Sequence, residues 1–96
     1  MSRPKVRDVK DELVSLRQLV ARNPGDLDVG LRLGSSLYNA NDYIGSATAL
    51  QSVLRHHPHH LQTLLLLAGA EARSGHIPAA LKVLAQAQTV HPSSPQ

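Results

Sequence analysis

Apolar side chains recur along the chain at the spacing of a helix face, in five stretches separated by short polar segments. The first stripe steps by three and four residues and stops before Asn23, Pro24 and Gly25. Its apolar members are Val6, Val9, Leu13, Leu16 and Val20. The same interpretation of the whole chain predicts helices at residues 8–22, 26–39, 42–57, 61–74 and 76–91. The sequence has no alternating β-branched and aromatic runs, so the predicted fold class is all-α.

Residues that start and stop helices stand at the boundaries of these stretches. Asp26 can accept a hydrogen bond from a backbone amide in the first turn of the second helix. Asn41 and Gly75 follow the second and fourth helices, where a residue with positive φ commonly ends a helix. Pro78 falls in the first turn of the fifth helix, where its missing amide does little harm. Each of these boundaries therefore has a local chemical cause.

The chain also aligns with itself at an offset of 34 residues (61 − 27), which pairs residues 27–60 with residues 61–94. The matched pairs include Leu33 with Leu67, Gly34 with Ala68, Ala49 with Val83, Leu50 with Leu84, and Pro58 with Pro92. A repeat of this length with two helices predicts a solenoid, whose units bury their apolar faces against their neighbours. In the same register Leu16 aligns with Leu50 and Leu84, so the first helix of the chain stands as the second helix of an incomplete unit.

The spacing and several residues resemble the tetratricopeptide repeat (TPR) family. The first unit carries Leu33-Gly34, Asn41-Asp42-Tyr43, Ser46, Leu50, Val53 and Pro58 at the family's motif positions, and the second carries Leu67-Ala68, Gly75, Ala80, Leu84, Ala87 and Pro92. The departures are Gly30 and Leu64, where the family often has Trp, and Leu37 and Glu71, where it often has Tyr. The resemblance implies a right-handed helical solenoid of about five antiparallel helices.

The predicted organisation is a single domain at residues 8–92 with a short tail at each end. The basic N-terminal tail is placed at residues 1–7 and the C-terminal tail at residues 93–96. Between them lie the extra helix at residues 8–22, repeat 1 at residues 27–60 and repeat 2 at residues 61–94.

The family resemblance also implies where a partner binds, because the first helix of each TPR unit lines a concave groove. By register the groove positions are Asp28, Leu31, Arg32, Ser35, Tyr38 and Asn39 in repeat 1, and Gln62, Leu65, Leu66, Gly69, Ala72 and Arg73 in repeat 2. Family members that grip a C-terminal carboxylate use Lys and Asn where this chain has Leu31 and Ser35, which argues against such a clamp. An apolar and helical segment of a partner fits this groove better. Within the run Leu64 to Leu67, geometry forbids burial of all four side chains on one side, and Leu65 and Leu66 are the expected exposed pair.

The two ends of a solenoid differ from its middle, because no further unit covers them. Val20, Leu54 and Gln88 occupy equivalent late positions of the three second helices, so an apolar docking position becomes polar in the last unit. Leu81 and Val90 are the candidate end interface for self-association, whereas Leu84 is expected to pack inward.

Composition and charge narrow the function further. The 96 residues are 42% hydrophobic but include no Phe, Trp or Cys, so we expect a modestly stable core and no disulfide or thiolate chemistry. The longest apolar stretch, Leu64 to Ala70, cannot span a bilayer, and a cytoplasmic location is expected.

The net charge of +3 includes Arg3, Lys5, Arg7 and Lys10 near the start, but acidic residues interrupt this run, which argues against nucleic-acid binding. No phosphate loop or nucleophile motif is present, so no enzyme activity is expected.

The segment His56-His57-Pro58-His59-His60 raises the question of a metal site, since imidazole nitrogen binds zinc and nickel. The aligned junctions at residues 22–26 and 90–94 form without this cluster, and four near-adjacent ligands rarely converge tetrahedrally. We therefore expect neither a metal nor a cofactor.

The function expected from the sequence is a non-catalytic adaptor or assembly chaperone that binds an apolar segment of another protein in its groove. The alternative is a self-associating scaffold that uses the exposed solenoid ends. Nucleic-acid binding ranks below both.

Overall fold

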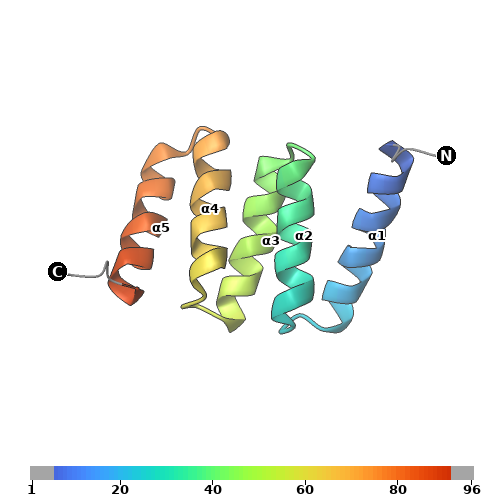
Figure 1. Cartoon of the computed structure of the whole chain (residues 1–96), viewed down its shortest axis with the longest axis horizontal. Coiled ribbons are helices and arrows are strands. Elements are labelled where there is room, and N and C mark those ends of the chain that lie inside the picture. The colour runs from blue at the N-terminus through green and yellow to red at the C-terminus, as the bar shows by residue number, and fades with distance from the viewer. Residues whose placement is uncertain (1–5, 92–96) are drawn as a thin grey trace.

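The structure is a computed structural model that describes residues 6–91, and these form a single row of five antiparallel α-helices (Figure 1). The helices are α1 (Val6–Arg22), α2 (Leu27–Asn39), α3 (Tyr43–His56), α4 (Leu61–Arg73) and α5 (Ile77–Val90). The described residues contain no strand, so the predicted all-α helical repeat is confirmed, with each predicted boundary within two residues of the observed one. The predicted tail at residues 1–7 is too long, because Val6 and Arg7 already belong to α1. Residues 1–5 and the tail at residues 93–96 lie outside the described residues.

Packing between the helices follows the order of the chain. Each helix packs on the next one, and α2 also approaches α4, whereas the backbones of the second helices α1, α3 and α5 do not come close to one another. First helices that approach each other and second helices that spread apart give the row a concave side formed by α2 and α4. None of the described helices is long and apolar enough to cross a lipid bilayer.

The core consists of two apolar clusters, one for each place where a second helix is covered by the next first helix. Leu16 of α1 packs with Leu33 and Leu37 of α2. Leu50 of α3 belongs to the larger cluster, which includes Leu64 and Leu67 of α4 together with the other buried members Ala47, Ala68, Ala70, Val83 and Ala87. The equivalent leucines Leu16 and Leu50 are therefore buried by equivalent neighbours, as the repeat predicts.

At one contact between the two helices of a unit, the large and the small side chain swap helices between repeat 1 and repeat 2. In repeat 1, Gly30 is buried against Val53, and a Cβ built on Gly30 would lie 2.6 Å from Val53 Cγ2. At the same two positions repeat 2 has Leu64 and Ala87, both buried in the larger cluster. The large residue is thus on the second helix in one unit and on the first helix in the other. Through this exchange Val53 supplies beside Gly30 part of the side-chain volume that the larger family residue would fill.

The cap of α2 and the two left-handed stops are formed by residues that the sequence indicated, and Asp42 adds a cap at the start of α3. Asp26 Oδ1 accepts a hydrogen bond from the Val29 amide at 3.1 Å, and Asp42 Oδ1 accepts one from the Gly45 amide at 2.8 Å. Asn41 has φ 67° and Gly75 has φ 87°, which confirms the predicted left-handed residues at these two stops.

The N-cap of α4 is a histidine. His60 is the counterpart of Asp26 in the repeat register, and its Nδ1 accepts a hydrogen bond from the Thr63 amide at 3.3 Å. Because this acceptor takes the place of the Asp26 carboxylate, we expect His60→Ala and Asp26→Ala each to lower the free energy of unfolding by about 1 kcal/mol. His60→Asp should retain the cap and add a favourable charge at the helix N-terminus, so its stability should equal or exceed that of the wild type. Urea unfolding followed by circular dichroism measures all three, and a His60→Asp variant as weak as His60→Ala would contradict the assignment.

Candidate binding surface

The predicted groove positions on the two first helices are all exposed or half-buried. None of them is buried, whereas the neighbouring positions of α2 and α4 form the core. Ser35 of α2 and four residues of α4 line a hollow of about 500 Å³ between the two helices, and the α4 residues are Leu61, Gln62, Leu65 and Leu66. The structure thus brings part of the predicted set together around one mostly apolar hollow.

The expected exposed pair in the four-leucine run is only half confirmed. Leu65 is 48% exposed, as predicted. Leu66 is half-buried and packs against the larger apolar cluster, so it forms the floor of the hollow instead of an open surface. Successive helical side chains are about 100° apart, so Leu66 can pack against the core while its neighbour Leu65 stays exposed.

Arg73 and two tyrosines lie together at the other end of this surface, where α2 and α4 end. Arg73 Nε donates a hydrogen bond to the Tyr38 hydroxyl at 2.9 Å. The Arg73 guanidinium also lies 5.7 Å from the centre of the Tyr38 ring and 5.6 Å from that of Tyr43, and the two rings meet edge to face. Such contacts favour the cation, and the hydrogen bond with Tyr38 raises the pKa of Arg73 above its ordinary value. Sequence register identified Tyr38 and Arg73 separately but gave no sign that they meet.

The remaining groove residues differ in their exposure. Asp28, Arg32, Asn39, Gln62 and Ala72 are exposed, and Leu31 is half-buried against the larger cluster. Gly69 leaves room for Tyr38, because a Cβ at this position would lie 3.1 Å from the tyrosine oxygen. Among the residues that the structure describes, no carboxylate forms an ion pair with Arg73. The cation is therefore held in place and available to an incoming acidic group.

The structure differs from the predicted end interface in the positions of Leu84 and Val90. Leu81 is exposed, as expected, but Leu84 is also 43% exposed, so the prediction that it packs inward is wrong. Its equivalent Leu50 is covered by α4, and no described helix follows α5 to cover Leu84. Val90 is half-buried and lines a different surface, on the side of α5 that faces α3. Leu81 and Val90 therefore do not form one interface.

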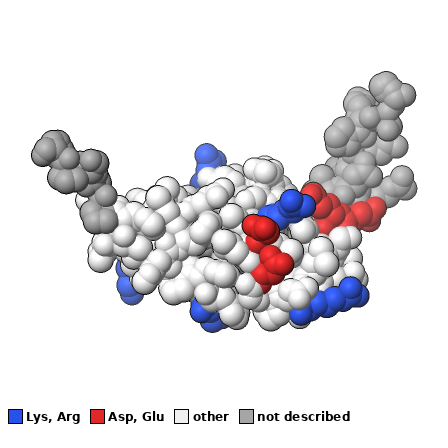
Figure 2. Space-filling view, turned by 60° about the horizontal axis from the view of Figure 1, so that its bottom comes forward, with Lys and Arg blue, Asp and Glu red and all other residues white. Residues whose placement is uncertain are grey.

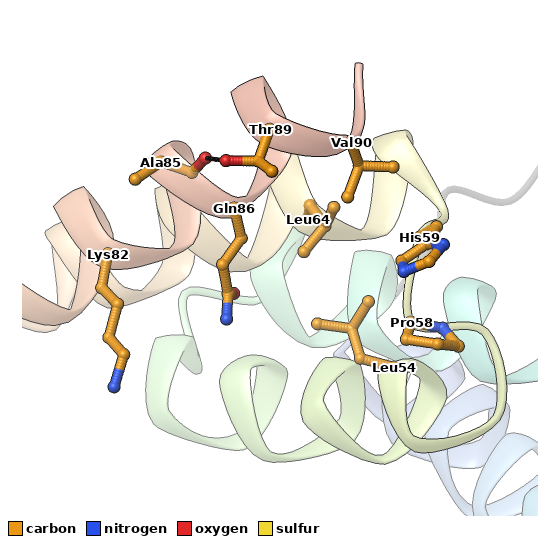
Figure 3. A pocket seen from close by; sticks show the side chains of 9 residues that line it. All are labelled: Leu54, Pro58, His59, Leu64, Lys82, Ala85, Gln86, Thr89 and Val90. Carbon is orange, nitrogen blue, oxygen red and sulfur yellow. Dashed lines mark hydrogen bonds between the residues drawn. The ribbon is translucent and has the colours of Figure 1, made fainter. Parts of the chain in front are cut away.

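A second hollow lies on the convex side, between α3 and α5. It measures about 560 Å³, and Leu54, Leu64 and Val90 point toward its centre (Figure 3). A similar hollow of about 410 Å³ lies between α1 and α3, and its lining residues Val20 and Pro24 are the repeat equivalents of Leu54 and Pro58. Because the backbones of the second helices stay apart, a hollow of this kind recurs between successive second helices. It is a consequence of repeat packing and gives no sign of a specific ligand.

The histidine-rich segment has structural roles at the junction between the repeats. His57 Nε2 donates a hydrogen bond to the Gly25 carbonyl at 2.8 Å, and its repeat equivalent His91 donates one from Nε2 to the His59 carbonyl at 2.8 Å. Each bond ties the end of a second helix to the preceding turn. His60 caps α4, so the neighbouring rings of this segment serve different contacts. Within residues 6–91 no group of three or more His, Asp or Glu side chains is placed to share a metal ion.

The buried Glu71 also has a structural explanation. Its carboxylate accepts hydrogen bonds from Gln51 Nε2 at 3.2 Å and from His76 Nδ1 at 2.9 Å. Leu37 occupies the same position in repeat 1, so repeat 2 replaces an apolar contact with a polar one that links α3, α4 and the start of α5. Both hydrogen bonds hold neighbouring helices together, and no nucleophile lies in this arrangement.

Charge is distributed unevenly over the molecule. Figure 2 shows the acidic side chains over the N-terminal part of the face that it displays, whereas the surface over α4 and α5 carries only separate basic side chains. From residue 61 to residue 91 the charged residues are Glu71, Arg73 and Lys82, apart from histidine. The described basic residues form no continuous stripe of the kind that follows a nucleic-acid backbone. Arg3 and Lys5 lie outside the described residues.

Comparison with known proteins gives one finding. The family model described as tetratricopeptide repeat matches residues 37–96, which is more than half of the chain. No curated protein matches the chain. Repeats of this family generally mediate protein–protein interaction.

Proposed function

The chain belongs to the tetratricopeptide repeat family, and from this membership we propose that it is a non-catalytic adaptor or assembly chaperone that binds another protein through the open face of α2 and α4. The occupant is an amphipathic helical segment of the partner. The single observation that carries the proposal is the hollow formed by Ser35, Leu61, Leu65 and Leu66, which offers apolar surface between two first helices.

The distance from this hollow to Arg73 adds a requirement on the partner. Leu65 and Arg73 are eight residues apart on α4, which corresponds to about 12 Å along the helix axis. Tyr38 and Tyr43 hold the guanidinium in place, so little side-chain freedom is lost when an acidic group binds. A helix lying along α4 would place apolar side chains in the hollow and an Asp or Glu about two turns away at Arg73.

The experiment begins with capture of proteins from native lysate on the immobilised chain. Labelled segments of each captured protein are then titrated with the chain, and binding is measured by fluorescence anisotropy. We expect Leu65→Glu and Ser35→Glu to weaken binding by about tenfold or more, because both place a charge in the apolar hollow. Arg73→Met should weaken it about two- to fivefold, since an exposed ion pair contributes little, and this difference should vanish at high salt.

Leu81→Glu is the matched control, because Leu81 lies on α5 and away from the hollow. Circular dichroism first establishes that all variants have equal helix content. Binding that survives Ser35→Glu but is lost with Leu81→Glu would contradict the proposal and assign the partner to the end of the solenoid. Equal affinity of all four variants would also contradict it.

A further inference from the structure

The C-terminal end of the row carries an apolar surface that the described residues leave uncovered. We define the C-terminal face as Ile77, Leu81 and Leu84 of α5 together with Leu61 and Leu65 of α4, all of which are exposed. Leu61, Leu65 and Leu84 line one shallow hollow of about 300 Å³ with Gln88, so the residues from the two helices form one surface.

The repeat itself provides the internal control for this exposure. Ala47 and Leu50 of α3 are the repeat equivalents of Leu81 and Leu84, and α4 covers them. Ala47 is 7% exposed, whereas Leu81 is 61% exposed. On α1, Leu16 and Val20 are covered in the same way by α2. The same kind of surface is covered by α2 on α1 and by α4 on α3, whereas no described helix covers it on α5. The C-terminal face is thus a surface on which a helix can dock.

We propose that the occupant of the C-terminal face is a second copy of this chain, related by a two-fold axis. Along α5 the positions Ile77, Leu81, Leu84 and Gln88 follow steps of four, three and four residues. This spacing is the seam on which two helices pack side by side over several turns. In an antiparallel pair Leu81 lies opposite the partner's Leu84, and Ile77 lies opposite the partner's Gln88 at the rim.

The scarcity of charged residues on α5 also supports a second copy of this chain as the occupant. Lys82 is the only charged residue of α5, and it lines the hollow between α3 and α5 instead of the C-terminal face. A two-fold contact therefore brings no like charges together, which an isologous interface otherwise cannot avoid when its centre is charged.

The opposite end of the chain argues against head-to-tail stacking. Ser46 and Val53 of α3 contact Gly34 and Gly30 of their own first helix, and the equivalent residues of α1 are Glu12 and Leu19. Head-to-tail contact would set the apolar stripe of α5 against Glu12. Two chains stacked head to tail would need a first helix between α5 and α1, and the described residues include no such helix beyond α1 or α5. The C-terminal face is therefore matched by itself better than by the other end.

Sedimentation velocity of the isolated chain over a range of concentrations tests the proposal. The wild type should show a reversible transition from 10.3 kDa to twice that mass. Leu81→Glu should raise the dimer dissociation constant by about a hundredfold or more, because each dimer then buries two charges in an apolar contact. Ile44→Glu is the matched control: Ile44 is 68% exposed on α3, outside the C-terminal face, and this variant should dimerise like the wild type.

Two results would overturn the proposal. One is a wild-type chain that stays at 10.3 kDa at the highest concentration reached. The other is a dimer that persists in Leu81→Glu with unchanged helix content. Since the measurement uses the chain alone, its failure leaves the groove proposal standing. Partner binding that survives Ser35→Glu would contradict the groove proposal and would leave this one standing.

Discussion

Leu50→Ala is expected to lower the free energy of unfolding by about 2–5 kcal/mol, one of the largest losses that a single side chain of this protein can cause. Leu50 is fully buried, and it lies where α2, α3 and α4 meet. A Cβ added to Gly34 would collide with the Leu50 side chain, which shows how closely α2 approaches it. Removing the side chain leaves a cavity bordered by three helices. A domain of this size has about 5–15 kcal/mol of stability in total, so much of it would be lost.

The matched control for this prediction is Leu84→Ala. Leu84 is the same residue at the same place of the next repeat, but no described helix covers it. Its removal should cost well under the loss at Leu50 when unfolding is measured at low protein concentration. At high concentration the cost should grow if the C-terminal face is buried in a dimer. Equal losses at the two positions under dilute conditions would contradict the burial difference. Urea unfolding followed by circular dichroism gives both values.

The contrast between Leu50 and Leu84 also marks what the sequence could and could not predict. The helices and their ends were predictable, because the signals are local: Asp26 caps α2 and Asn41 ends it within a few residues. Burial was not predictable from the residue type, since Leu50 and Leu84 are the same residue at equivalent positions, and among the described helices only Leu50 has a following helix that covers it. The register was known, but which helix face lacks a neighbour depends on the assembled row.

The candidate surface was predictable to the same extent. The repeat register identified an open face of α2 and α4 position by position, because a fixed period carries each position from one unit to the next. It missed the contact of Arg73 with Tyr38 and the bond from His57 to the Gly25 carbonyl, both of which join residues far apart in the sequence. Such contacts depend on how two units stack. No local pattern of the chain encodes that geometry.

The exchange of volume between Gly30–Val53 and Leu64–Ala87 leads to the second large effect. Gly30→Leu should lower the free energy of unfolding by about 1–3 kcal/mol through overpacking, even though Leu favours the helix more than Gly. The reason is that a Cβ alone would come within 2.6 Å of Val53 Cγ2, and a β-branched side chain has few rotamers in which to withdraw.

Val53→Ala should be destabilising by about 1.5–3 kcal/mol when it is the only change, because it removes buried apolar volume beside Gly30. The double variant Gly30→Leu with Val53→Ala reproduces the pair that repeat 2 already uses. It should regain most of the loss, with a favourable coupling energy of about 1 kcal/mol or more. Chemical unfolding of the four proteins provides the cycle. Simple addition of the two losses would mean that the repeats reach the same fold with independently packed interiors, and the exchange would then be a coincidence of sequence.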